Sequence, residues 1–163
     1  MNLTAFNTVL AAPKAQPTKT FDALYKLTND LIGVKLFTLI TFCESSNAAT
    51  RLYSNMPDAY PVAGTKEVEE NLWTTRVLRQ HNTFVANSIE EIAEVFPDFD
   101  LIQSLGCESC INIPVIVCGS VIGTLNCLHE NGYFTPERVA KSEHLKLPGA
   151  AAFLAAKQIE TGV

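Results

Sequence analysis

Two runs of β-branched and aliphatic residues, at 109–116 and 120–128, dominate the pattern of apolar and polar positions along the chain. A short break at Val117-Cys118-Gly119 separates them. Because β-branched residues favour strands and glycine favours turns, the pattern predicts an antiparallel hairpin. We place a three-residue loop at the break, because it puts Gly119 in the left-handed conformation that glycine tolerates.

This register gives the predicted hairpin two unlike faces, because successive strand residues point to opposite sides. The apolar face carries Ile111, Ile113, Val115, Val121, Gly123, Leu125 and Cys127. The other face carries Cys110, Asn112, Pro114, Ile122, Thr124, Asn126 and Leu128. A slip of one residue would mix the two sets. We therefore expect helices to pack on the apolar face and a partly polar cavity to lie on the other.

Before this hairpin, the pattern predicts a helix, a first hairpin and an irregular loop. Apolar residues recur at helical spacing over residues 18–32, and Gly33 ends the run. Dense apolar residues predict strands at 36–42 and 49–54. The prolines and glycine of residues 53–66 then indicate a long loop, either a lid over a binding site or a packed surface connection.

Between the two hairpins, the pattern predicts short helices and one strand. We expect a helix over residues 67–79 with Val68, Leu72 and Trp73 facing inward, and a strand at 83–86. Ser88 opens the next helix as an N-cap.

A further short helix follows, and the last helix closes the chain. Asp98 is expected to cap residues 99–105, which end at Gly106. After the second hairpin, Thr135-Pro136-Glu137 starts the last helix, which we expect Pro148-Gly149 to interrupt before it resumes over residues 150–160.

Length and charge narrow the class of protein. At 163 residues the chain predicts one domain over residues 18–163, preceded by an N-terminal arm at 1–17 that forms a short helix or binds a partner. The net charge of −5 and the lack of a basic stripe argue against a nucleic-acid partner. No signal peptide or apolar run of membrane-spanning length is present, so we expect no membrane contact. Five cysteines, an odd number, favour reduced thiols and a cytoplasmic location.

The order of these elements and the residues of the second hairpin resemble the GAF domain family, in particular small stand-alone bacterial GAF proteins. The resemblance covers about residues 20–160. Its motifs are Leu105-Gly106, Ser109, Ile113-Pro114-Val115, Gly119, Ile122-Gly123, Leu125 and Phe134-Thr135-Pro136-Glu137. It implies an α/β (α+β) fold with a central antiparallel sheet of five or six strands in an order near 2-1-5-4-3. It also implies terminal helices on one face and a ligand-type pocket on the other.

The polar face of the hairpin is our candidate binding site for an unidentified small molecule, because a few polar groups in an apolar hollow are typical of ligand sites. Asn112, Thr124 and Asn126 are the candidate hydrogen-bonding residues, unless they form a buried structural pair. The candidate apolar wall consists of Cys110, Tyr60, Trp73 and Phe84. The low charge of this face favours a neutral or aromatic ligand over a phosphate. We expect a sensory or regulatory module without catalytic residues or a cofactor.

The cysteines raise an enzymatic alternative. Cys107 and Cys110 form a CxxC pair, but no second pair or suitably spaced histidines complete a metal site, so we expect no metal. Free methionine-(R)-sulfoxide reductases are single GAF domains with a nucleophilic cysteine and hairpin carboxylates. This chain has Cys110, Asn126 and Leu128 where the resemblance places those acids, and no cysteine at residues 44–106. A thiol-dependent reductase, using Cys107, Cys110 or Cys118, is therefore the alternative function.

The terminal helices also suggest an assembly. They are amphipathic, and Ala150-Ala151-Ala152-Phe153-Leu154 offers an apolar surface. GAF domains often pair through such helices, so the resemblance implies a homodimer.

Overall fold

The computed structural model of the chain describes residues 1–62 and 64–162. Ala63, in the predicted loop, and Val163, the last residue of the predicted domain, lie outside the described residues. Within them, no helix has the length and apolar character needed to cross a bilayer.

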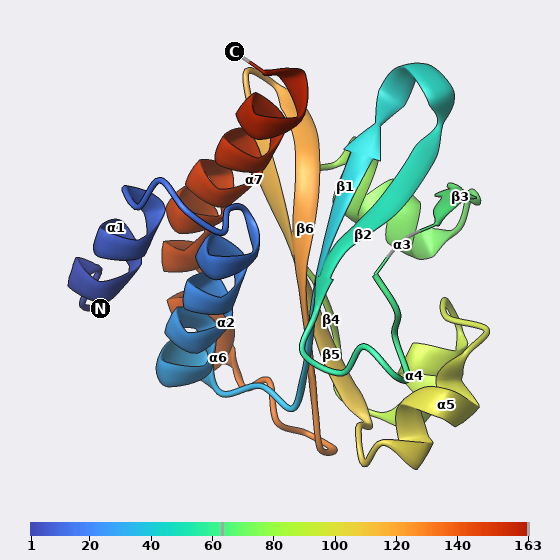
Figure 1. The fold of residues 1–163 in the computed structure, drawn as a ribbon. Coiled ribbons are helices and arrows are strands. Elements are labelled where there is room, and N and C mark those ends of the chain that lie inside the picture. Colours follow the sequence, from blue (N-terminus) through green and yellow to red (C-terminus); the bar gives the residue numbers. More distant parts are fainter. Residues whose placement is uncertain (63, 163) are drawn as a thin grey trace.

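Six antiparallel strands form one sheet in the order β3-β2-β1-β6-β5-β4 (Figure 1). The strands are β1 (Leu36–Cys43), β2 (Ala48–Ser54), β3 (Thr65–Glu67), β4 (Phe84–Ala86), β5 (Ser109–Val117) and β6 (Ser120–His129). Apart from the short edge strand β3, this is the predicted order 2-1-5-4-3. The predicted fold class is therefore confirmed.

A layer of helices covers one face of the sheet (Figure 1). It contains α1 (Thr4–Leu10), α2 (Thr18–Ile32), α6 (Pro136–Ser142) and α7 (Lys146–Thr161), and α7 packs directly on β5 and β6. The core between the layers contains Leu24, Phe37, Ile113 and Leu125, all fully buried. The strand residues among them, Phe37, Ile113 and Leu125, have odd numbers. The even-numbered residues of the central strands therefore point to the opposite face.

Short helical segments lie on that opposite face (Figure 1). They are α3 (Leu72–Thr74), the π-helix η2 (Thr75–Arg79), α4 (Ile89–Ala93) and α5 (Phe99–Ser104). Two 3₁₀ turns, η1 (Glu44–Ser46) and η3 (Glu143–Leu145), connect elements elsewhere. The second apolar cluster of the protein forms between these segments and the sheet, and it includes Leu36, Trp73, Ile92 and Leu128.

The central hairpin reverses through two residues, so the predicted three-residue loop is wrong. Val117 pairs with Ser120, and only Cys118 and Gly119 form the turn. Their φ angles are 51° and 83°. Two positive φ angles in succession match the twist of antiparallel strands, and this match outweighs the steric cost at Cys118.

A bulge next to this turn keeps the side chains farther along the strands on the faces that we predicted, although their pairing differs from that of a three-residue loop. Val115 pairs with Gly123 and Ile116 pairs with Val121, so Ile122 is the extra residue. The bulge exchanges the faces that we predicted for Val121 and Ile122. Ile122 packs against the helix-side core, and Val121 lines a small pocket on the opposite side.

The helix predicted at residues 67–79 begins only at Leu72, because β3 pairs with β2 and Asn71 caps the helix start. The Asn71 side chain accepts from the backbone N–H of Thr74, and the Thr74 hydroxyl accepts from the N–H of Asn71. Trp73 is buried as predicted, but Leu72 is 57% exposed and Val68 is only half-buried.

Two further helix boundaries differ from the prediction. Asp98 precedes α5 without capping it, because its carboxylate accepts a hydrogen bond from Tyr60 instead. Pro148 does not interrupt α7, because it lies in the first turn, where a helix needs no backbone N–H. The Ser88 and Thr135 caps form as predicted.

The predicted N-terminal arm contains α1, which packs on α2 and α7. Phe6 inserts into the helix-side core and is only 3% exposed. The separation of residues 1–17 from a domain at 18–163 stays a prediction.

Candidate functional site

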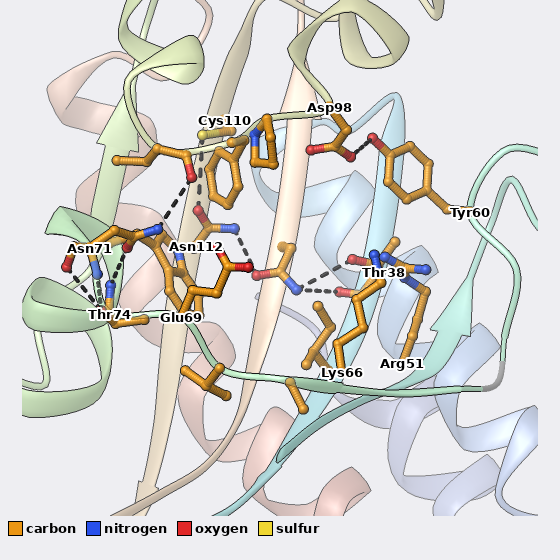
Figure 2. Close-up of a pocket in the computed structure, with 18 of the residues that line it drawn as sticks. Thr38, Arg51, Tyr60, Lys66, Glu69, Asn71, Thr74, Asp98, Cys110 and Asn112 are labelled. Carbon is orange, nitrogen blue, oxygen red and sulfur yellow. Dashed lines mark hydrogen bonds between the residues drawn. The ribbon is translucent and has the colours of Figure 1, made fainter. Parts of the chain in front are cut away.

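A pocket of about 370 Å³ lies on the sheet face opposite α2 and α7 (Figure 2). Its floor consists of sheet residues, among them Leu36, Thr38, Ile40, Arg51, Cys110, Asn112, Asn126 and Leu128. Three covering segments lie over it, namely residues 56–62 through Tyr60, residues 66–74, and residues 95–102. The volume lies within the range of small-molecule sites, which is roughly 300–1,000 Å³.

A row of polar side chains crosses the floor, because Thr38, Asn126 and Asn112 are direct partners on three neighbouring strands. Nδ2 of Asn112 donates to Oδ1 of Asn126 at 2.7 Å, and Nδ2 of Asn126 donates to Oγ1 of Thr38 at 3.3 Å. All three residues are at most 5% exposed. The row is therefore a buried polar network in an apolar floor, with its donors directed by strand register.

Cys110 extends this network at its β5 end. Its thiol donates to Oδ1 of Asn112 at 3.9 Å. Burial raises the pKa of Cys110 to about 12, so the sulfur keeps its proton at neutral pH. Oδ1 of Asn112 therefore accepts only a weak hydrogen bond from the thiol. One of the two amide hydrogens of Asn112 has no partner in the row.

Aromatic rings form one wall of the pocket. Trp73 lies 5.9 Å from Phe42 and 6.3 Å from Phe96, centroid to centroid, and Phe96 meets Phe84 edge to face at 6.2 Å. These separations are typical of stabilising aromatic pairs. Nε1 of Trp73 is buried and has no acceptor among the described residues.

The opposite end of the pocket carries charge. Figure 2 shows Arg51 and Tyr60 at this end, and Asn71 and Thr74 at the other. The Arg51 guanidinium lies over the Tyr60 ring, 5.0 Å from Cζ to the ring centroid. The Tyr60 hydroxyl donates to Oδ2 of Asp98 at 2.6 Å. Burial and this carboxylate raise the pKa of Tyr60, so the phenol stays protonated and ties two covering segments together.

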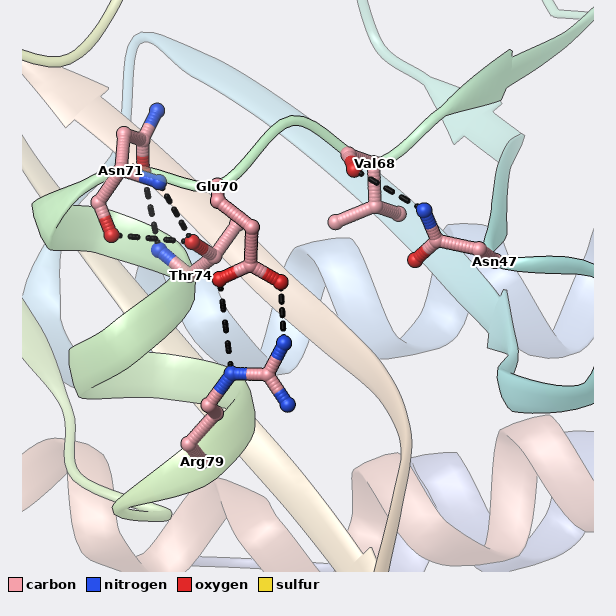
Figure 3. A network of polar contacts seen from close by, with 6 residues as sticks. All are labelled: Asn47, Val68, Glu70, Asn71, Thr74 and Arg79. Atoms are coloured by element: carbon pink, nitrogen blue, oxygen red, sulfur yellow. Dashed lines mark hydrogen bonds and ion pairs between the residues drawn. The ribbon is translucent and has the colours of Figure 1, made fainter.

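Polar contacts on both sides hold the middle covering segment, residues 66–74 (Figure 3). Asn47 Nδ2 donates to the Val68 carbonyl at 3.1 Å, and Arg79 forms an ion pair with Glu70. With the cap between Asn71 and Thr74, these contacts place Trp73 over the sheet.

No three histidine, cysteine or acidic side chains within residues 1–62 and 64–162 gather closely enough to hold a metal ion. All five cysteines are free.

The GAF domain model matches residues 18–159. The chain belongs to the GAF family. The match covers nearly all of the sequence given. The resemblance found in the hairpin motifs is thereby confirmed.

Solved GAF domains share the fold at low identity. A GAF domain/HD domain protein from Geobacter sulfurreducens is 12% identical, with a TM-score of 0.66 over 99% of both chains. GAF domains of phosphoenolpyruvate-protein phosphotransferases give similar values. The one from Coxiella burnetii is 15% identical, with a TM-score of 0.66 over 99% of both chains. The one from Acinetobacter is 12% identical, with a TM-score of 0.67 over 98% of this chain and 94% of that one. No curated protein matches this sequence.

Five of the seven predicted site residues line the pocket of this GAF domain. They are Asn112, Asn126, Cys110, Tyr60 and Trp73. Thr124 is fully buried in the sheet next to the pocket, and its hydroxyl has no partner among the described residues. Phe84 lies behind Phe96 and supports it. Their roles as ligand contacts stay predictions.

Arg51 is the main pocket residue that the sequence pattern did not indicate. Ile40 pairs with Arg51, and Leu39 pairs with Tyr53. Leu52 is therefore the extra residue of a bulge in β2. Without this bulge, strand alternation would put Arg51 and the pocket-side Ser54 on opposite faces. Asp98 and Phe96 were missed as well, because both lie in the covering segments, where no strand period applies.

Proposed function

We propose that this GAF domain is a small-molecule-binding sensory or regulatory module without catalytic activity of its own. The observation that carries the proposal is the polar row of Thr38, Asn126 and Asn112 on the floor of the 370 Å³ pocket. Buried amides are costly unless they are satisfied, and a few directed polar groups among apolar walls are what fixes a bound ligand. Membership of the GAF family supports the same role.

The covering segments suggest how binding is reported. A ligand changes a protein only through different affinities for two of its arrangements. Tyr60 and Asp98 join two covering segments by one hydrogen bond, so a ligand in contact with both would favour one arrangement of the pair. A partner protein that binds only this arrangement would then respond to the ligand.

A metabolite library tests the proposal by thermal denaturation. At least one compound should raise the Tm, because a ligand that binds only the folded state stabilises it. The shift should disappear in Asn126→Leu, which removes the central amide of the row, and persist in Asn7→Leu, an exposed asparagine of α1. If no compound shifts the Tm of the wild-type protein, the row is structural and the proposal is rejected.

A thiol-dependent free methionine-(R)-sulfoxide reductase is the second candidate, because the Cys110 thiol lines the pocket. The acid strength of the cysteines weighs against it. Burial raises the pKa of both Cys107 and Cys110, whereas a nucleophilic cysteine needs a lowered pKa. Loss of free methionine sulfoxide in the presence of a thioredoxin system would establish the reductase, and unchanged substrate would discard it.

We further propose that the protein forms a homodimer and works in the cytoplasm. The dimer proposal rests on apolar side chains that α7 exposes, among them Leu154, which is 46% exposed. The location rests on the odd number of cysteines, all free in the structure.

A further inference from the structure

Arg51 carries a charge that no carboxylate neutralises at close range. Nη1 donates to the Pro61 carbonyl at 3.1 Å, but the buried Nε has no acceptor, and within the described residues no carboxylate oxygen lies within 4 Å of the guanidinium. Asp98 interacts electrostatically with Arg51, but its Oδ2 is already bonded to Tyr60. Burial lowers the pKa of Arg51, yet a guanidinium keeps its proton at neutral pH. A half-buried cation without a carboxylate partner is costly unless an anion arrives.

The other unused polar groups of the pocket lie in its floor and its aromatic wall. Nε1 of Trp73 is a buried donor without an acceptor, and Trp73 itself is only 9% exposed. Asn112 has an amide hydrogen that the row leaves free. A ligand that suits this pocket therefore brings acceptors to both ends, and places a flat apolar body between them.

We propose that the ligand is a small aromatic carboxylate, with its carboxylate at Arg51 and its ring against Phe42, Trp73 and Phe96. The inference rests on the proposed binding function. A carboxylate fits because it offers two coplanar oxygens and a single charge to one guanidinium. The ring fits because this wall is aromatic. A hydroxyl on the ring would give the indole N–H its acceptor.

The charges around the pocket favour a carboxylate over a phosphate. Lys66, Glu67 and Glu69 also line it, and all three are exposed. The two glutamates outnumber Lys66, and Arg51 is the one cation of the lining with a buried donor. A phosphate dianion would bring a second negative charge into a pocket lined by three carboxylates, those of Glu67, Glu69 and Asp98. The inference keeps the sequence-based expectation of an aromatic rather than a phosphate ligand, and adds a carboxylate to it.

The single tryptophan of the chain makes the test direct, because Trp73 lines the pocket and its fluorescence reports on occupancy. The probes are 4-hydroxyphenylacetate and its neutral amide, titrated into the full chain at neutral pH, with phenyl phosphate as the third probe. We expect the carboxylate to bind about tenfold or more tightly than the amide, as a charge-assisted hydrogen bond implies.

Two variants at Arg51 and one control locate the effect. Arg51→Gln should remove the preference for the carboxylate, and Arg51→Lys should keep part of it because the charge remains. Arg76→Gln is the control, because Arg76 is exposed on η2 outside the pocket and should leave both affinities unchanged. Circular dichroism confirms that each variant is folded.

The outcomes separate this inference from the proposed function. Equal binding of acid and amide, tighter binding of phenyl phosphate, or an unchanged preference in Arg51→Gln overturns the carboxylate inference and leaves the binding function intact. Fluorescence that none of the three probes changes, while other library compounds raise the Tm, overturns it as well. If neither the probes nor the library bind, both proposals fail.

Discussion

The cysteines of this protein differ in acid strength, because their surroundings shift the thiol pKa in opposite directions. Cys43 is exposed at the end of β1, with its sulfur 3.2 Å from the Ser45 hydroxyl. Hydrogen bonds from Ser45, and then from Ser46, lower the pKa of Cys43 to about 7. Burial raises the pKa of Cys110 and Cys127. The sequence alone gave no basis for this difference, because it depends on a turn that brings two hydroxyls to one sulfur.

Alkylation by iodoacetamide should therefore select Cys43. The thiolate is the reactive form, so the rate should rise through pH 7 and fall below it as the sulfur gains its proton. Ser45→Ala removes the largest stabilising bond and should move the midpoint to higher pH. Mass spectrometry of peptides measures both, with the native Cys110 as the unreactive control. A Cys43 midpoint near 9 in the wild type would contradict the prediction.

The elements show which parts of the fold a sequence pattern can predict. The unlike faces of β5 and β6 followed from strand alternation, and Asn112 and Asn126 share a face as predicted. The turn between the strands was wrong, because the fit of a two-residue turn to the strand twist outweighs the cost of a positive φ at Cys118. The bulge at Ile122 compensates, so that the side chains beyond it lie on the faces predicted with the wrong loop.

Bulges and caps explain most of the other misses. The apolar spacing of Val68 and Trp73 indicated one long helix, but the Asn71 cap and the pairing of β3 override it. Trp73 was still identified as a buried wall residue, because burial needs only an apolar side chain near the sheet. Arg51 could not be found, because the bulge at Leu52 is set by pairing with β1 and leaves no sequence signal.

The contact between β6 and α7 depends on a residue without a side chain. A Cβ at Gly123 would lie 2.4 Å from the Phe153 ring and 2.7 Å from the Ile40 carbonyl oxygen. Gly123→Ala should lower the free energy of unfolding by about 1–3 kcal/mol, the usual cost of overpacking. Urea denaturation measures the loss, and Ser120→Ala, at the exposed start of the same strand, should change it little. Equal stability of Gly123→Ala and the wild type would show that α7 shifts to accommodate the added methyl group.

For the whole molecule, the resemblance to GAF domains, which rested on element order and hairpin motifs, implied the sheet order and the two layers. The location of the pocket followed as well, since only one sheet face lacked long helices. Its charge did not follow. Five charged residues line the pocket. Four of them, Lys66, Glu67, Glu69 and Asp98, lie in the covering segments.

The homodimer is testable at this scale. Light scattering at micromolar concentration should give twice the mass of the 17.8 kDa chain. Leu154→Glu should shift the mass toward the monomer, because it puts a charge on the apolar surface of α7. Leu72→Glu is the matched control, as Leu72 is 57% exposed on the other side of the sheet. A wild-type protein that is monomeric under these conditions rejects the dimer.

The helix layer carries both ends of the described chain, behind the sheet and away from the pocket (Figure 1). A surface, a fluorescent protein or an enzyme can therefore be attached through α1 or α7 without obstructing the entrance for small molecules. Because the sheet lies between the two layers, a conformational change in the covering segments can reach an attached group only through a shift of the strands. A fusion at α7 would thus turn the sheet itself into the transmission element of a biosensor.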